Sequence, residues 1–320
     1  MPLDSVPRAV RALRISCVVP CFNEGRSIEL LVPALRRVLE KLADEWEVIF
    51  VDDGSSDDTA EVLKSLSKQT GFRAVLLSRN FGKEAALTAG MQAARGDVVV
   101  LMDGDLQHPP ELIETMVRHW RDNADVVYAV HASRHDESLL KRIGARLTYA
   151  MLNMSSRVRV PEGGGDFRLL DRSAVDAILR LPERNRFMKG LYAWVGFKAV
   201  GIEYSPPPRA FGKSSFNLLS LLGLAVDGIT AFTTWPLRMV SVVGILLAIP
   251  SFIYGGFLVG EHVLYGNPVS GWTTLVVCLL LFFGVQMISI GILGEYVARI
   301  FEEVKGRPLF VVRAELGSGL

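Results

Sequence analysis

Short apolar runs alternate with amphipathic stretches along the first 130 residues of the chain. The apolar runs are typical of buried strands, and the stretches that separate them show the spacing of helices. The strands are expected at residues 15–20, 47–51, 73–78 and 98–102, and the first helix at about 27–44. Strand followed by helix, repeated in this way, predicts an α/β fold built on a mainly parallel, doubly wound sheet.

Polar side chains follow three of these strands at the point where each strand ends. Asn23 and Glu24 follow the first strand, Asp53 the second, and Asp103 and Asp105 the fourth. The carboxyl ends of parallel strands meet at one edge of a sheet, where open α/β sheets bind their ligands. A lone Asp-x-Asp after a strand is usually only an acidic loop. The expected convergence of the three clusters therefore carries the prediction of a site.

Hard oxygen ligands are concentrated in the stretch DGDLQHPPE. Asp103 and Asp105 flank Gly104, and Gln107 adds an amide oxygen two residues later. Such donors suit Mg²⁺ or Mn²⁺ that carries a diphosphate. The phosphate-binding patterns GxGxxG and GxxxxGK[ST] do not follow any strand, which argues against a dinucleotide dehydrogenase and a P-loop NTPase.

The middle of the chain is basic. Six cations lie within about 25 residues, which indicates either a solvated face or a nearby anionic ligand; they are Arg134, Lys141, Arg142, Arg146, Arg157 and Arg159. Three glycines then precede Asp166, so this segment is either a plain loop or a place where the backbone approaches a ligand closely. Further on, Lys213 lies in the stretch RAFGKSS, which we expect to be a flexible cationic lid over phosphates.

Hydrophobicity rises sharply after about residue 215, and this rise accounts for the mean hydropathy of +0.30. Residues 216–226 are apolar but stop at Asp227, too short to span a bilayer, so an interfacial amphipathic helix is expected there, with a buried core helix as the alternative. Residues 239–260 and 272–294 carry no charge and predict two transmembrane helices.

The distribution of basic residues predicts how this hairpin is oriented. The loop at 261–271 has no Lys or Arg, whereas both flanks are basic, so both ends should be cytoplasmic. The N-terminus has no apolar signal segment, and three cysteines make no disulfide framework, in keeping with a cytoplasmic soluble part. A net charge of +1 argues against a nucleic-acid partner.

The expected organisation has five parts. A cytoplasmic catalytic domain at 14–213 follows an N-terminal extension at 1–13. An interfacial helix region at 214–235 leads into the transmembrane hairpin at 236–298, and a cytoplasmic tail occupies 299–320. The expected location is the cytoplasmic (inner) membrane.

Several motifs together resemble those of a known family. The stretches VVPCFNE, VDDGSSDDT, NFGK and DGDLQHPPE are similar to glycosyltransferase family 2, with its GT-A nucleotide-diphosphosugar fold. The later stretches GGGDFRLLDR, PERNRFMKGLYAWVGF, RAFGKSSFN and GEYVARIFEEVKGRP resemble polyprenyl-phosphate glycosyltransferases, the nearest type being the bactoprenol glucosyltransferases. The resemblance covers about residues 14–312. The QxxRW signature of processive synthases is absent, which counts against a polysaccharide synthase.

The resemblance implies that a sugar passes from a nucleotide diphosphate to a polyprenyl phosphate with inversion. It implies catalytic roles for Asp166, Asp105, Arg134 and Arg168, and Mg²⁺ or Mn²⁺ held by Asp103, Asp105 and Gln107. The donor site would be formed by Pro20, Phe22, Asn23, Glu24, Asp53, Asn80, Lys83, Asp103 and Gly104. The acceptor phosphate would bind Arg134, Arg142, Arg168 and Lys213. Relatives also suggest a tetramer.

The acceptor affects the role expected of Asp166. A phosphate monoester is already anionic near neutral pH, with a second pKa around 6, so it needs little deprotonation. We therefore expect Asp166 to orient the acceptor or the sugar, although the family usually assigns it the role of base.

Three functional alternatives stay open at this stage. UDP-glucose is the best guess for the donor, but GDP-mannose, UDP-GlcNAc and UDP-aminoarabinose suit the same scaffold. The acceptor could instead be another lipid, such as diacylglycerol or a ceramide. A non-catalytic subunit that binds nucleotide sugars is the third alternative, and the intact Asp103, Asp105, Gln107 and Asp166 argue against it.

Overall fold

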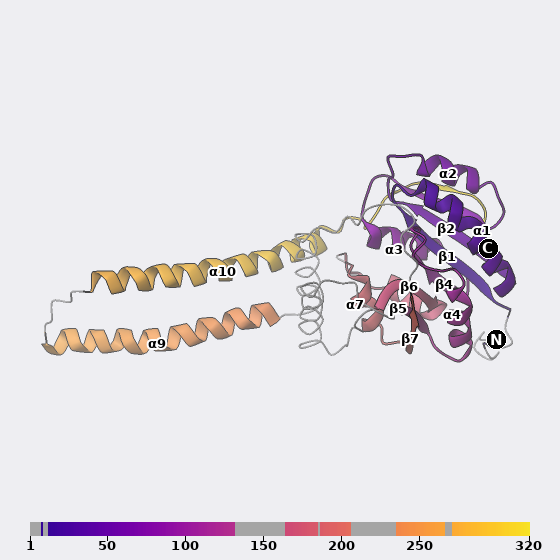
Figure 1. The fold of residues 1–320 in the computed structure, drawn as a ribbon. Helices are drawn as coiled ribbons and strands as arrows, with labels where there is room; N and C mark the ends of the chain where they lie inside the picture. Colours follow the sequence, from indigo (N-terminus) through magenta and orange to yellow (C-terminus); the bar gives the residue numbers. More distant parts are fainter. Residues whose placement is uncertain (1–7, 9–11, 132–163, 185, 206–234, 266–270) are drawn as a thin grey trace.

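A computed structural model describes residues 8, 12–131, 164–184, 186–205, 235–265 and 271–320. Within these residues eight strands form one sheet in the order β7-β5-β6-β4-β1-β2-β3-β8. Figure 1 shows this sheet with the helices around it. The strands are β1 (Arg14–Cys21), β2 (Glu45–Asp52), β3 (Phe72–Leu77), β4 (Val98–Leu101), β5 (Val126–His131), β6 (Gly164–Asp171), β7 (Ala199–Tyr204) and β8 (Val312–Leu316).

The sheet is mostly parallel. Strand β1 pairs in parallel with β2 and β4, β2 with β3, and β5 with β7. The antiparallel members are β6, which lies between β4 and β5, and β8, which pairs with β3. The predicted α/β class and the four predicted N-terminal strands are confirmed.

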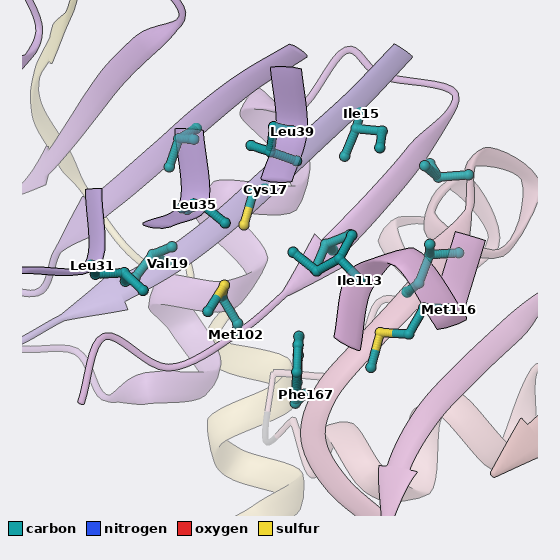
Figure 2. Packing of buried hydrophobic residues seen from close by; sticks show 14 of the residues in the cluster. Ile15, Cys17, Val19, Leu31, Leu35, Leu39, Met102, Ile113, Met116 and Phe167 are labelled. Atoms are coloured by element: carbon teal, nitrogen blue, oxygen red, sulfur yellow. The ribbon is translucent and has the colours of Figure 1, made fainter. Parts of the chain in front are cut away.

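Helices pack on both faces of the sheet. They are α1 (Gly25–Leu42), α2 (Thr59–Leu66), α3 (Lys83–Ala93), α4 (Leu112–Arg121), α6 (Arg172–Leu179) and α7 (Met188–Trp194). On one face Leu31, Leu35 and Leu39 of α1 belong to the same buried cluster as Cys17 of β1 and Phe167 of β6 (Figure 2). A second buried cluster joins α3, α6 and α7 to the other face. Each fully buried leucine of this kind contributes about 1.5–3 kcal/mol.

Strand β6 corrects the prediction made for the glycine segment before Asp166. The sequence predicts either a plain loop or a backbone that approaches a ligand closely, whereas the structure has a strand here. Leu169 and Phe167 face one buried cluster while Leu170 faces the other, so the segment is a central strand with both faces covered. The glycines at its start hide this alternation in the sequence. Asp166 consequently lies on a rigid strand.

Two long helices form a hairpin beside the sheet domain. They are α9 (Trp235–Tyr265) and α10 (Trp272–Lys305), and Figure 1 shows them side by side, projecting away from the sheet. Large apolar side chains along them are exposed, among them Ile253, Phe257 and Ile288. Among the described residues one segment, Phe282–Lys305, is long and apolar enough to cross a membrane by length and composition. The two-span topology stays a prediction.

The segment predicted as a cytoplasmic tail, 299–320, contains the end of α10 and a strand of the sheet. Helix α10 continues to Lys305, and β8 then returns to the sheet and pairs with β3. The carboxylate of Glu303 accepts a hydrogen bond from the backbone N–H of Arg184 at 2.8 Å. The end of the hairpin is therefore attached to the sheet domain. The predicted interfacial helix falls almost wholly outside the described residues.

Candidate active site

The polar clusters that follow β1 and β2 are joined directly by hydrogen bonds. The side-chain oxygen of Asn23 accepts the backbone N–H of Ser56 at 2.9 Å, and the N–H of Asn23 donates to the hydroxyl of Ser55. Asn23 adopts a left-handed conformation with φ of 57°, which asparagine tolerates better than most residues. The predicted convergence of these two loops is confirmed.

The cluster that follows β4 lies beside the first one. Gly104 is buried, and a Cβ atom at this position would lie 2.7 Å from a carboxylate oxygen of Glu24. Only glycine lets the two loops approach this closely without a shift. All three predicted clusters therefore meet at the carboxyl edge of the sheet.

Asp53 braces the segment that leads into α3. Its two carboxylate oxygens accept the backbone N–H groups of Phe81 and Gly82 at 2.7 and 2.8 Å. Burial raises the pKa of this carboxyl, and the two N–H donors partly oppose that shift. Both carboxylate oxygens of Asp53 thus bind the loop that leads into α3. Asn80 lies in the same loop and is exposed.

Lys83, at the start of α3, links two of the predicted carboxylates. Its ammonium lies 2.6 Å from an oxygen of Asp103 and 2.7 Å from an oxygen of Asp166. Burial would lower the pKa of Lys83, but the two carboxylates outweigh it and raise that pKa above its ordinary value. For Asp166, burial opposes ionisation, yet Lys83 and Lys189 hold its pKa well below the usual range. The site thus holds a charged cation between two carboxylates.

His108 contributes to the loop after β4 and was not assigned a role from the sequence. Its Nδ1 accepts the backbone N–H of Asp103 at 3.0 Å, and its ring stacks on Phe167 with centroids 4.8 Å apart. Burial lowers the pKa of His108, which favours the neutral ring that this hydrogen bond requires. The imidazole therefore fixes the backbone from which Asp103 projects. The position of His108, five residues after Asp103, could have indicated this role from the sequence. Its stacking on Phe167 could not have been predicted.

The donor atoms near Asp105 fit a hard divalent cation by their chemistry. Asp105 accepts the backbone N–H of Gln107 at 3.0 Å, and Leu106 between them has a φ of 66°. This turn keeps the two side chains on one short loop with Asp103, whose carboxylate already attracts the Lys83 ammonium. Within the described ranges, no group of three or more His, Cys, Asp or Glu side chains is placed to hold a metal. The predicted set of two carboxylates and an amide stays a prediction.

Arg168 is buried rather than presented to solvent. It is 5% exposed, donates to the carbonyl of Gly165 at 2.6 Å, and its guanidinium carbon lies 3.7 Å from the ring centroid of Tyr192. Burial lowers the pKa of this guanidinium. Its predicted contact with an acceptor phosphate is untested.

The remaining predicted residues divide into two groups. Pro20 is buried in β1, and Phe22 is 46% exposed at the same edge of the sheet as Asn23. Arg134, Arg142 and Lys213 lie outside the described residues, so their assigned roles stay predictions.

The family model described as glycosyl transferase family 2 matches residues 16–179, the part of the chain that contains the three clusters and Asp166. The chain belongs to glycosyltransferase family 2. Membership makes it a transferase, and its mostly parallel α/β sheet is the GT-A-like fold that the sequence predicts.

Relatives of this glycosyltransferase match it over nearly its whole length. The bactoprenol glucosyl transferase of Shigella phage SfII is 41% identical over 302 residues, which cover 94% of this chain and 98% of the relative. A prophage bactoprenol glucosyl transferase homolog of Escherichia coli is 40% identical, covering 94% and 99%. An uncharacterized glycosyltransferase of Synechocystis sp. is 41% identical, covering 94% and 95%.

Proposed function

We propose that this glycosyltransferase moves a hexose, with glucose from UDP-glucose as the first choice, onto undecaprenyl or another polyprenyl phosphate, with inversion at the anomeric carbon. One observation carries the proposal: the match to bactoprenol glucosyl transferases covers 94% of the chain and so extends beyond the family 2 domain into the helical hairpin. A lipid-borne acceptor explains why a catalytic domain should be joined to an apolar hairpin.

We further propose that α9 and α10 are two transmembrane helices that anchor the enzyme. Exposed apolar side chains, with Leu246 at 64%, Phe257 at 63% and Phe283 at 59%, would cost free energy in water and are favoured in lipid. The pairing of β8 with β3 keeps the end of the hairpin near the catalytic domain, as a two-span anchor requires. Both termini and the catalytic domain would then be cytoplasmic.

The charged residues suit the transfer that we propose. Asp103, Asp105 and Gln107 would hold Mg²⁺ or Mn²⁺, which would offset charge on the leaving nucleotide diphosphate. Lys83 would then be released from Asp103 and contact the diphosphate. Asp166 stays ionised beside Lys83 and would orient the acceptor or the sugar. The acceptor phosphate is already an anion and needs no strong base.

The test is a transfer assay with the full chain in membranes. Labelled UDP-sugars and GDP-sugars are supplied one at a time with undecaprenyl phosphate and Mg²⁺ or Mn²⁺. We expect one donor to move label into the organic phase, and EDTA to abolish that transfer until metal is restored. Label that reaches diacylglycerol or ceramide but not undecaprenyl phosphate would refute the proposed acceptor. Light scattering in detergent would test the predicted homotetramer.

A further inference from the structure

Helix α7 lies against the site but contains no residue with a predicted role. Met188 and Leu191 are each 1% exposed and Tyr192 is 6% exposed, and all three belong to the buried cluster that includes α3. The helix is short, so its position is determined by this packing and not by its own propensity. This packing fixes the backbone of α7 relative to α3.

The aromatic ring of Tyr192 connects α7 to the strand of Asp166. The Arg168 guanidinium stacks over this ring at 3.7 Å, and Arg168 follows Asp166 by two residues on β6. Side chains two apart on a strand project from the same face of the sheet. Arg168 and Asp166 therefore project from the same face of the sheet, and α7 packs against this face through the contact between Tyr192 and Arg168.

Lys189 precedes Tyr192 by three residues, so the two side chains are neighbours on the surface of the helix. The backbone N–H of Met188, the residue before Lys189, donates a hydrogen bond to the carboxylate of Glu84 on α3, so this end of α7 lies beside the start of α3, where Lys83 is. The charge of Lys189 accordingly stabilises the ionised forms of Asp166 and Glu84. Within the described part of the chain its ammonium forms no hydrogen bond or ion pair, whereas Lys83 is engaged by two carboxylates. Lys189 is thus a cation near the catalytic carboxylate that is available to a ligand.

We propose that Lys189 binds a phosphate group of a substrate, either the diphosphate of the nucleotide sugar or the phosphate of the lipid acceptor. This inference rests on the proposed function, because that reaction brings two phosphate-bearing substrates to one site. Two anions repel each other, and Lys83, which already balances Asp103 and Asp166, adds little to what a bound metal would offset. A second ammonium on a packed helix reduces the repulsion and fixes one phosphate relative to Asp166.

Steady-state kinetics of Lys189→Ala tests the inference, with each substrate varied in turn. The loss of one charge-assisted hydrogen bond should raise the KM of one substrate about tenfold to a hundredfold. A rise for the nucleotide sugar identifies the donor diphosphate, and a rise for polyprenyl phosphate identifies the acceptor. Lys189→Arg keeps the charge and should restore most of the affinity. Lys198→Ala removes an exposed lysine nine residues away and should leave both KM values unchanged.

Unchanged KM values for both substrates in Lys189→Ala would overturn the inference, whatever happens to kcat. Equal increases in Lys189→Ala and Lys198→Ala would also overturn it, because they would indicate only a general effect of charge. If the wild-type enzyme transfers no sugar to polyprenyl phosphate, the proposed function fails independently. In that case, calorimetric titration of the full chain with inorganic pyrophosphate or inorganic phosphate, with Mg²⁺ present, tests the phosphate site at Lys189. Weaker binding by Lys189→Ala than by wild type supports the phosphate site, and equal or undetectable binding refutes it.

Discussion

Two clusters of opposite charges link strands and helices in this protein, and they differ in how much solvent reaches them. The amino-end cluster consists of Glu47 and Arg73, whose side chains are 0% and 9% exposed. The carboxyl-end cluster consists of Lys83, Asp103 and Asp166, whose side chains are 41%, 26% and 30% exposed. Each cluster joins a cation to carboxylates at distances near 3 Å, yet their surroundings are unlike.

The amino-end cluster is saturated by hydrogen bonds. Glu47 accepts from the Ser16 hydroxyl at 2.6 Å, from the Arg95 backbone at 2.9 Å and from Arg73 at 3.0 Å. Arg73 also donates to the carbonyl of Ala93. A buried ion pair with all its partners is costly to break but offers no place for a ligand. We infer that this cluster serves stability.

The carboxyl-end cluster is open, because all three of its side chains are partly exposed to solvent. An ammonium between two partly exposed carboxylates is easily displaced by a divalent cation or attracted by a phosphate. The exposure that weakens these ion pairs is therefore what makes them useful in a binding site. The contrast predicts that variants of the two clusters separate activity from stability.

The largest effect is expected from Asp105→Ala, next to the carboxyl-end cluster. On the proposed metal assignment, loss of this carboxylate should reduce transfer roughly a thousandfold. The variant should stay folded, because the side chain of Asp105 is only partly buried and lies on a loop. Label transfer and thermal unfolding measured on the same preparation check both expectations. Normal turnover of Asp105→Ala with metal present would refute the metal assignment.

Replacing one member of each cluster tests the contrast directly. Lys83→Met should lower transfer by about a hundredfold while changing the free energy of unfolding by less than about 1 kcal/mol, because its ion pairs are exposed. Glu47→Ala removes the buried carboxylate that pairs with Arg73 and leaves only the exposed Glu315, at 3.8 Å, so it should lower the free energy of unfolding by about 3–5 kcal/mol. Urea unfolding in mild detergent and transfer per folded molecule are the measurements.

A loss of activity at the amino-end cluster would contradict the contrast between the two clusters. If Glu47→Ala lowered transfer per folded molecule as much as Lys83→Met, the amino-end cluster would have a functional role. Lys64→Met provides a control, because Lys64 forms an exposed ion pair with Glu61 at 3.8 Å on a surface helix. That variant should change neither activity nor stability.

The four N-terminal strands could be predicted from sequence because each is a contiguous, mainly apolar run, and three of them end at a polar cluster. Strand β6 could not, because its alternation is short and starts with glycines, and its identity depends on pairing with β4 and β5. Strand β8 could not be predicted either. Its residues, VRAEL, are mostly exposed and show no apolar run, and the strand depends on pairing with the edge strand β3.

The site shows the same division. Asp103, Asp105 and Asp53 were predictable because parallel strands carry their carboxyl ends to one edge. His108 and the proposed phosphate ligand Lys189 were not. His108 stacks on Phe167, and Lys189 acts on Asp166, and both partners lie on β6, far away along the chain. Residues whose role arises from contacts between elements leave little periodic trace in the sequence.

A smaller effect is expected from Asp166→Asn, which tests whether the carboxyl-end cluster performs proton transfer. Burial opposes ionisation of Asp166, but Lys83 and Lys189 keep its pKa well below the usual range, so it stays charged throughout the pH range of an assay. The acid limb of the pH–rate profile should then come from the acceptor phosphate, with a pKa around 6. Asp166→Asn should lose about tenfold in rate and keep that limb. Disappearance of the limb would instead support a base.

The smallest effect concerns Glu84, which extends the carboxyl-end cluster into the interior. Burial raises the pKa of Glu84 to about 7, with Asp166 adding to the shift and Lys83 and Lys189 opposing it. Between the ordinary value of 4.5 and about 7 the folded state holds a proton that the unfolded state has lost, so stability falls as pH rises through this window. Glu84→Gln removes this titration and should be more stable than wild type by about 1 kcal/mol near pH 8, after allowance for solvent screening. Urea unfolding at several pH values measures the slope. The exposed control Glu61→Gln should keep the wild-type slope, and a wild-type slope in Glu84→Gln would show that Glu84 is ionised in the folded protein and that the cluster ends at Asp166.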